Sequence, residues 1–238
     1  MATPEDVARA LGRIRGRIER AGGDPATVRV VAVTKGFGPD AVSSALAAGL
    51  CDVGENYAQE LVAKHGELGP TAAGVRWHFL GAVQRNKVRM LAPLVDCWQS
   101  VARLAEGAEI AKRAPGATVL VEVETTGSAG RNGCPPPEVP GLVGALGDLE
   151  LRVAGLMTVA SVDPLEAAGG FRAVREMADR LGLAERSMGM TDDLELAVAE
   201  GSTMVRVGRA LFGDRPVRRG PAGRVQAASP PGPGGRRE

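Results

Sequence analysis

The sequence predicts an α/β fold, a (β/α)₈ barrel of the TIM type preceded by an N-terminal helix. Three observations lead to this fold class. Eight short stretches have the apolar, β-branched composition of strands, and helix-like segments lie between successive stretches. The strand-like stretches are apolar throughout rather than alternating, which is typical of parallel strands covered on both faces. Eight parallel strands are also the number that closes this kind of barrel.

The predicted elements follow one another in a regular order along the chain. The amphipathic segment that opens the sequence and ends at Gly23 has acidic residues in its first turn, and it is the predicted N-terminal helix. The expected strands are 28–35, 51–56, 75–81, 94–101, 117–125, 151–159, 186–190 and 203–213. The expected helices between them are 39–48, 57–68, 84–92, 101–113, 138–147, 164–182 and 192–200.

Two of the predicted helices carry clear start and stop signals. The helix over 39–48 has Asp40 in its first turn and Gly49 directly after its end. In the helix over 192–200, Thr191 or Asp192 is the expected N-cap, and Gly201 follows the last residue. An open, doubly wound sheet is the alternative fold, because the strand-like stretches at 51–56 and 186–190 are short.

The chain has room for one folded domain. The last predicted strand ends near residue 213, so residues 1–213 are expected to form a single barrel domain without a second catalytic domain. Residues 214–238 are rich in Pro, Gly and Arg and are predicted to be a disordered tail.

Composition and charge exclude several classes of protein. Hydrophobic residues make up 44% of the chain and charged residues 24%, and the formal net charge of +1 gives no electrostatic reason to expect nucleic acid as a partner. A membrane is not expected either, because no apolar run reaches the roughly 18 residues of a membrane span. The N-terminus lacks the apolar region of a signal peptide. The three cysteines, at 51, 97 and 134, fit free thiols in a reducing cytoplasm, and two histidines are too few for a histidine-based metal cluster.

Lys35 is the first candidate for chemistry, because it ends the apolar stretch "VRVVAVTK". Barrel enzymes build their sites at the carboxyl ends of the strands, so this ammonium is expected at the barrel mouth. The structural alternative is a lysine whose stem packs on the strand while its amine reaches water. Glu55, Asn56 and His78 also have structural alternatives. Glu55 and Asn56 can be helix-capping residues, and His78 can be a core histidine whose hydrogen bonds are satisfied.

The last two strands add a candidate anion site. Arg206 lies inside an apolar run, and its charge must meet an anion or an acceptor. Gly208 shares a strand face with Arg206 and leaves space for a ligand to approach the backbone. Backbone N–H groups near Ser187–Gly189 and Gly208–Arg209 are predicted to form a phosphate cup.

Pyridoxal 5′-phosphate (PLP) is the cofactor that needs this set of groups. It requires a lysine amine for a Schiff base, a partner for the pyridine nitrogen and a phosphate cup. An arginine opposite the pyridine nitrogen disfavours its protonation, so the ring would be a weak electron sink. A barrel enzyme that binds a phosphorylated sugar, with Lys35 as an electrostatic partner of the substrate, is an alternative from another class.

Several motifs resemble the pyridoxal phosphate homeostasis proteins, the YggS/PROSC family. They are "VAVTKG", "VGENYAQE", "WHFLGAVQRNK", "GLMTV" and "SMGMTDDLELAVAEGSTMVRVGRALFG", and the resemblance runs from about residue 5 to residue 213. It implies a barrel of the alanine racemase N-terminal type that lacks the second domain of that enzyme. The resemblance also assigns roles: Lys35 forms the Schiff base with PLP, Asn56 lies in the pocket, Arg206 faces the pyridine nitrogen, Ser187 lies on the phosphate side, and Gly208 and Arg209 border the phosphate. Gly189 is a predicted cofactor-binding residue through the phosphate cup alone.

The chain departs from the family pattern at a few positions. Arg209 stands where threonine is common, so the chain has no hydroxyl for the phosphate at this position, while the backbone N–H is kept. Glu122 and Glu124 share a strand face; they either add negative charge near the cofactor or face the helices. Arg131 stands where many members have a lysine, and an arginine cannot take up a second PLP as a Schiff base.

The resemblance implies a PLP carrier in intracellular PLP homeostasis, with little or no catalytic turnover. A racemase needs a base on each face of the substrate, and nothing in the sequence places Tyr57, the only tyrosine, opposite Lys35. A slow PLP-dependent amino-acid racemase is the alternative at the same site. The expected partners are PLP and PLP-dependent apo-enzymes, and the expected state is a cytoplasmic monomer.

Overall fold

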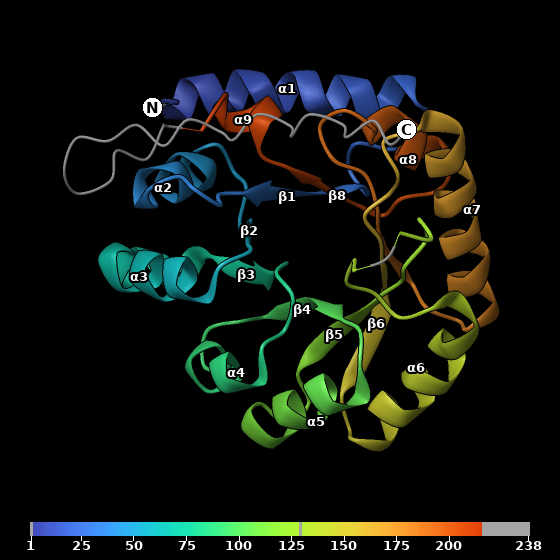
Figure 1. The fold of residues 1–238 in the computed structure, drawn as a ribbon. Coiled ribbons are helices and arrows are strands. Elements are labelled where there is room, and N and C mark those ends of the chain that lie inside the picture. The colour runs from blue at the N-terminus through green and yellow to red at the C-terminus, as the bar shows by residue number, and fades with distance from the viewer. Residues whose placement is uncertain (1, 129, 216–238) are drawn as a thin grey trace, which may run out of the picture.

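The computed structural model describes residues 2–128 and 130–215, and these form a closed parallel barrel surrounded by helices (Figure 1). Each strand pairs in parallel with the next one along the chain, and β8 pairs with β1 to close the ring. The predicted barrel is therefore confirmed, and the open doubly wound sheet is excluded. The strands are β1 (Arg29–Val33), β2 (Asp52–Glu55), β3 (Arg76–Phe79), β4 (Cys97–Val101), β5 (Thr118–Glu122), β6 (Arg152–Met157), β7 (Glu185–Ser187) and β8 (Met204–Val207).

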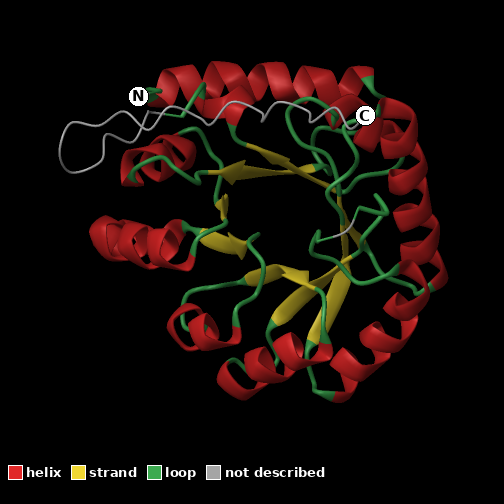
Figure 2. Cartoon of the chain, viewed as in Figure 1, coloured by secondary structure: helices red, strands yellow, loops and turns green. Residues whose placement is uncertain are grey.

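The helices lie outside the ring of strands, as Figure 2 shows. Short 3₁₀ turns cover Gly69–Gly74 and Pro136–Glu138. The α-helices are α1 (Pro4–Arg20), α2 (Pro39–Ala47), α3 (Ala58–Leu68), α4 (Arg85–Leu91), α5 (Leu104–Arg113), α6 (Val139–Asp148), α7 (Pro164–Arg180), α8 (Leu194–Ala199) and α9 (Arg209–Phe212). No helix in the described ranges combines the length and the apolar character that a membrane span needs.

Helix α1 precedes the barrel and lies across α8 and α9 (Figure 1). Its start is a capping box: the Thr3 hydroxyl accepts from the Asp6 N–H at 3.2 Å, and the Asp6 carboxylate accepts from the Thr3 N–H at 3.0 Å. The apolar stripe of α1, which includes Ile14 and Ile18, is buried in one cluster with residues of α8 and α9. This stripe is what attaches the predicted N-terminal helix to the barrel.

The segment after β8 differs from the sequence prediction. The expected strand over 203–213 ends at Val207, and residues 209–212 form the single helical turn α9. Leu211 and Phe212 are buried in the cluster with α1. A short apolar run fits a buried strand and a buried helix equally well, so its pattern cannot locate this change.

The start of α8 also differs, because its N-cap is Asp193 rather than Thr191 or Asp192. Both predicted caps have other partners. The Thr191 hydroxyl accepts from the backbone N–H of Ala210 at 3.4 Å, and the Asp192 carboxylate forms an ion pair with the Arg209 guanidinium. The loop after β7 is thus tied to α9, next to the barrel mouth.

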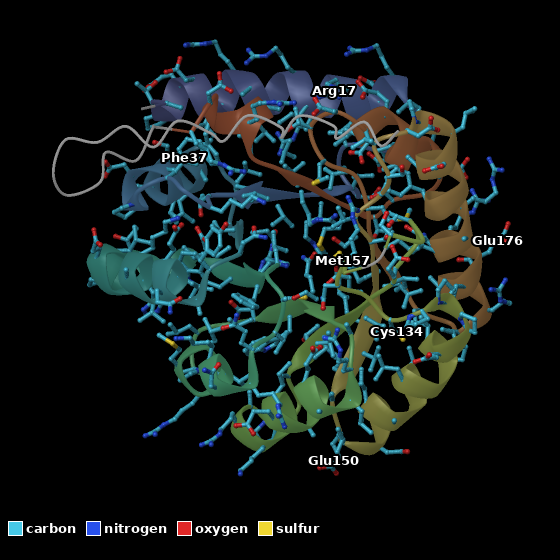
Figure 3. All side chains as sticks on the ribbon, viewed as in Figure 1. Arg17, Phe37, Cys134, Glu150, Met157 and Glu176 are labelled. Carbon is cyan, nitrogen blue, oxygen red and sulfur yellow. The ribbon has the colours of Figure 1, made fainter. Side chains whose placement is uncertain are left out.

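Besides the cluster with α1, a larger hydrophobic layer and a small cluster hold the barrel. The larger layer lies between the sheet and the helices and contains Trp77, Trp98 and Phe171. A small cluster of Cys97, Leu120 and Met157 is separate from it, and Met157 is seen within the ring of strands in Figure 3. The three cysteines are free, as the sequence predicts. The predicted tail lies outside the described residues from residue 216 onward.

Candidate functional site

A cavity of about 530 Å³ opens at the barrel mouth, where the strands end. This volume lies in the range of small-molecule sites. Apolar side chains form part of its wall, namely Val33, Phe37, Leu80, Met157 and Val159. Four cations and two carboxylates also line it, namely Lys35, Arg206, Arg209 and Arg215 with Asp192 and Asp214, so the lining carries a net positive charge.

Lys35 occupies the corner of a tight turn at the end of β1. The turn closes with a hydrogen bond from the Phe37 N–H to the Thr34 carbonyl at 3.0 Å, and Gly36 has a φ of 79°. A positive φ at the third position of a turn favours glycine, which explains why glycine follows the lysine directly. Lys35 lies two residues beyond the cavity residue Val33 and lines the same cavity.

A buried ionic cluster supports the turn from behind. Lys64 of α3 forms an ion pair with Glu55, and its ammonium donates to the Thr34 carbonyl at 2.6 Å. The Thr34 hydroxyl donates to Glu55 at 2.9 Å, and the Gly36 N–H donates to the Glu60 carboxylate at 2.9 Å. Glu55 is therefore part of the support beneath Lys35 rather than a simple helix cap.

Burial lowers the pKa of the Lys35 amine below its ordinary value of 10.5, and the positive charges of Arg215 and Arg206 lower it further, while Glu55 opposes them. The predicted direction of this shift, from limited solvation and Arg206, is confirmed. Below its folded-state pKa the protonated amine costs stability, and this cost disappears as the pH rises towards 10.5. A lysine in this environment is suited to attack a carbonyl, because the neutral amine is the nucleophile.

The reactivity of Lys35 towards an aldehyde is expected to reach half its maximum at a pH below 10.5. The measurement is reductive labelling with a simple aldehyde across the alkaline pH range, followed by peptide mapping of Lys35. A midpoint at or above 10.5 contradicts the electrostatic assignment of this lysine.

Arg206 is a buried cation that contacts neutral acceptors. Its Nη1 donates to the Ser187 carbonyl at 2.7 Å and the Ser187 hydroxyl at 2.8 Å, and its Nη2 donates to the Thr158 carbonyl at 2.7 Å. Burial lowers its pKa to about 10, against the attraction of Asp193 and Glu122. No carboxylate of the described residues forms an ion pair with Arg206. The guanidinium therefore fits a ligand that offers an acceptor or a negative charge.

Asn56 lines the cavity with an unsatisfied amide. Its Oδ1 is buried and has no hydrogen-bond partner among the described residues. Buried polar atoms are normally paired, so this amide is suited to bind a polar group of a ligand or a water molecule.

Gly208 and Arg209 lie where β8 ends and α9 begins, and both line the cavity. A Cβ atom at Gly208 would lie 3.0 Å from the Val33 carbonyl oxygen, so glycine allows β8 to approach β1 closely here. The first backbone N–H groups of a helix have no intrahelical acceptor, and those of Gly208 and Arg209 are suited to a phosphate. The Arg209 side chain itself pairs with Asp192.

Ser187 and Gly189 do not line this cavity in the described structure. Ser187 is fully buried, and its hydroxyl donates to Gln99 at 2.7 Å while it accepts from Arg206. Gly189 presents its carbonyl to the Arg206 N–H at 3.0 Å. Both residues thus contact Arg206, and their place beside the phosphate stays a prediction.

Glu122, the last residue of β5, and Glu124, two residues later, have different contacts. Glu122 is buried, accepts from Asn132 and lines a smaller, separate cavity, and burial raises its pKa. Glu124 accepts from the N–H groups of Thr126 and Gly127 and so holds a loop turn. The Arg131 guanidinium donates a hydrogen bond to the Val159 carbonyl at 3.2 Å, so this side chain links the loop after β5 to the segment after β6.

Sequence reasoning missed several residues of the site. Thr191 and Asp192 were expected only as helix caps, and Arg215 only as part of the tail, yet all three line the cavity. The spacing of Glu60 and Lys64 on one helix face was a readable signal, because side chains four residues apart are neighbours. Gln99 gave no signal, since its role depends on contacts across the barrel.

The fold and the cavity define a class: (β/α)₈ barrels of the alanine racemase N-terminal type, with a lysine at the end of β1 in a cationic mouth. The chain matches the family "Alanine racemase, N-terminal domain" over residues 11–216. It is 41% identical over 220 residues to the pyridoxal phosphate homeostasis protein of Pseudomonas aeruginosa, covering 89% of this chain and 95% of that protein. It is 35% identical over 230 residues to the protein of the same name from Escherichia coli K12, covering 88% and 97%.

A solved structure agrees with these sequence relatives. PipY from Synechococcus elongatus, determined with PLP bound, has a TM-score of 0.77 and 31% identity, covering 87% of this chain and 100% of that one. The chain belongs to the pyridoxal phosphate homeostasis protein family, as its motifs predict.

Proposed function

We propose that this protein binds PLP at the barrel mouth and serves intracellular PLP homeostasis, holding the cofactor as a Schiff base on Lys35 with little or no turnover. The observation that carries the proposal is Lys35 itself, a half-buried amine with a lowered pKa in a cavity lined by additional cations. The PLP-bound relative with the same fold supports the choice of ligand.

The groups around the cavity fit the parts of PLP. Lys35 would take the aldehyde, Arg206 would face the pyridine nitrogen, and the N–H groups of Gly208 and Arg209 would hold the phosphate. The unpaired amide of Asn56 would meet a polar substituent of the ring. The net positive lining suits a ligand whose phosphate carries negative charge.

When PLP is bound, it supplies an aldehyde carbon that condenses with an amine. Lys35, as the neutral amine, would hold the cofactor through that carbon as a Schiff base, and the aldehyde oxygen would leave as water with the two hydrogens of the amine. Hydrolysis would release the cofactor again, so Lys35 would hold PLP covalently and reversibly.

The low turnover is inferred from the position of Tyr57, the tyrosine that could serve as a second base. Racemisation needs a second base on the far face of the substrate. Tyr57 is 56% exposed at the start of α3 and is not among the described residues that line the cavity. An open cavity at the mouth, as the described residues form it, also favours exchange of the cofactor over carbanion chemistry shielded from water.

The proposal also covers the partner proteins, the oligomeric state and the cellular compartment. PLP-dependent apo-enzymes are the proposed recipients of the cofactor, and the protein is proposed to act as a monomer in the cytoplasm. Three free thiols suit such a reducing compartment.

Titration of the purified protein with PLP tests the proposed function. We expect saturable uptake of about one PLP per chain, with an absorbance band that differs from that of free PLP. Enantiopure alanine and other amino acids are expected to racemise no faster than with free PLP. Absence of binding overturns the function, whereas rapid racemisation by the loaded protein identifies the alternative, a PLP-dependent racemase.

A further inference from the structure

A line of hydrogen bonds crosses the barrel interior from Arg206 to the amino-terminal ends of the strands. Arg206 Nη1 donates to Ser187 Oγ at 2.8 Å, and Ser187 Oγ donates to Gln99 Oε1 at 2.7 Å. Gln99 Nε2 lies 2.7 Å from His78 Nδ1, and His78 Nε2 lies 2.9 Å from Asp52 Oδ1. We call these five residues the relay.

Every member of the relay is buried. Ser187 and Gln99 are 0% exposed, and the most exposed member, Asp52, is only 7% exposed. Buried polar groups are stable only when their hydrogens and lone pairs are matched. The position of each hydrogen in the relay can therefore be derived.

The contacts of Asp52 determine which ring nitrogen of His78 carries the hydrogen. Arg76 donates to both oxygens of Asp52, at 3.0 and 2.6 Å. Burial raises the pKa of Asp52, but the hydrogen bonds from His78 and Arg76 outweigh burial and leave this pKa below its ordinary value. The ionised carboxylate can only accept, so Nε2 of His78 carries the hydrogen.

The middle of the relay fixes the orientation of Gln99. Its Nε2 also donates to Met204 Sδ at 3.0 Å, and a thioether has no hydrogen to give. The amide therefore directs its NH₂ group at Met204 and His78, and its oxygen at Ser187. The reversed amide would leave the hydroxyl hydrogen of Ser187 without an acceptor, because Arg206 offers only donors.

We propose that Gln99 is a positioning residue for the cofactor site, acting on Arg206 through Ser187. By accepting the Ser187 hydroxyl hydrogen, Gln99 keeps an oxygen lone pair directed at the Arg206 guanidinium. Neutral His78, with its hydrogen on Nε2, keeps Gln99 in the required orientation. The inference rests on the proposed function, since it concerns the arginine that would face the cofactor ring.

Nitrogen-15 NMR of the protein without PLP tests the relay itself. The chain has two histidines, His65 and His78, so assignment needs only one variant, His65→Gln. We expect His78 to show a protonated Nε2 and an unprotonated Nδ1 at neutral pH. A hydrogen on Nδ1 overturns the relay, and this result is independent of whether PLP binds.

The effect on the cofactor site is tested with Gln99→Leu, a change of similar size without hydrogen-bonding groups. We expect its PLP affinity to fall by about tenfold or more, the scale expected for a buried group left unpaired. Leu146→Ala is the control: Leu146 is a buried leucine of α6 with no part in the relay, and its removal also destabilises the fold. The control is expected to keep the parent affinity.

The outcomes separate the inference from the proposed function. Unchanged PLP affinity in Gln99→Leu, or an equal loss in Leu146→Ala, overturns the positioning role. If the parent itself binds no PLP, the proposed function fails and the positioning role with it. In that case the His78 tautomer still decides whether the relay is correctly assigned. If Gln99→Leu does not fold, two other measurements serve as the test. They are the nitrogen-15 NMR spectrum of the parent protein and the PLP affinity of Ser187→Ala, which is expected to fall by a similar factor.

Discussion

Replacing Lys64 with methionine is expected to lower the free energy of unfolding by about 3–5 kcal/mol, the scale measured when one partner of a buried ion pair is removed. The Lys64 and Glu55 side chains are 5% and 0% exposed, so solvent does not screen their attraction. Methionine fills a similar volume but leaves the Glu55 carboxylate unpaired in the interior. The Thr34 carbonyl also loses its ammonium donor. Urea denaturation of the two proteins at neutral pH measures the difference.

The double variant Lys64→Met/Glu55→Gln is the matched control for this loss. Its stability is expected to recover most of the difference, because no buried charge is then left without a partner. Burial already raises the pKa of Glu55 despite the opposing charge of Lys64. The loss in Lys64→Met is therefore expected to shrink as the pH falls towards 4.5, the ordinary value of this group, where Glu55 becomes neutral. A loss below about 1 kcal/mol, or simple additivity in the double variant, shows that the pair is not energetically coupled.

Replacing Lys35 with alanine is expected to abolish retention of PLP through gel filtration and to remove the absorbance band of the bound cofactor. Among the described residues that line the cavity, Lys35 alone carries an amine that can form a Schiff base with the aldehyde. The turn around Lys35 should persist, because its backbone is held by Lys64 and Glu60 and not by the Lys35 side chain. Any loss of PLP would then reflect chemistry rather than unfolding, and a thermal melt of the variant checks this point.

Lys112→Ala provides the control for the loss of one positive charge. Lys112 is exposed on α5, away from the cavity lining, and its replacement is expected to leave uptake unchanged. Equal cofactor uptake by Lys35→Ala and the parent contradicts the assignment of Lys35 as the residue that forms the Schiff base. The sugar-phosphate reading, in which Lys35 acts only by its charge, would then gain support.

The fold could be predicted because its pattern is local. Apolar stretches such as 28–33 and 117–122 contain enough β-branched residues to mark buried strands without knowledge of their neighbours. The end of β8 could not be placed, because the burial of Leu211 and Phe212 against α1 depends on packing between chain ends far apart in the sequence. The cap of α8 was predicted wrongly for a similar reason, because Asp192 forms an ion pair with Arg209 of α9, which follows the neighbouring strand β8.

The site was predictable where a residue type is unusual for its position. A lysine after a buried strand and an arginine inside one are both uncommon, and both Lys35 and Arg206 line the cavity. The resemblance assigns Ser187 to the phosphate side, which stays a prediction, and the structure shows its hydroxyl between Arg206 and Gln99. Sequence spacing could not reveal this, because the two partners come from β8 and β4 and meet only inside the closed barrel.

Borohydride reduction of the PLP-loaded protein, followed by mass mapping, tests the central claim most directly. The hydride converts a C=N bond to a stable amine, so the attachment point survives digestion. The chain has four lysines, at 35, 64, 87 and 112, and each lies in a different sequence context. We expect the adduct on Lys35, at about one per chain. An adduct spread over Lys87 and Lys112, or none on Lys35 after PLP is added, contradicts the account of a cofactor held at the end of β1.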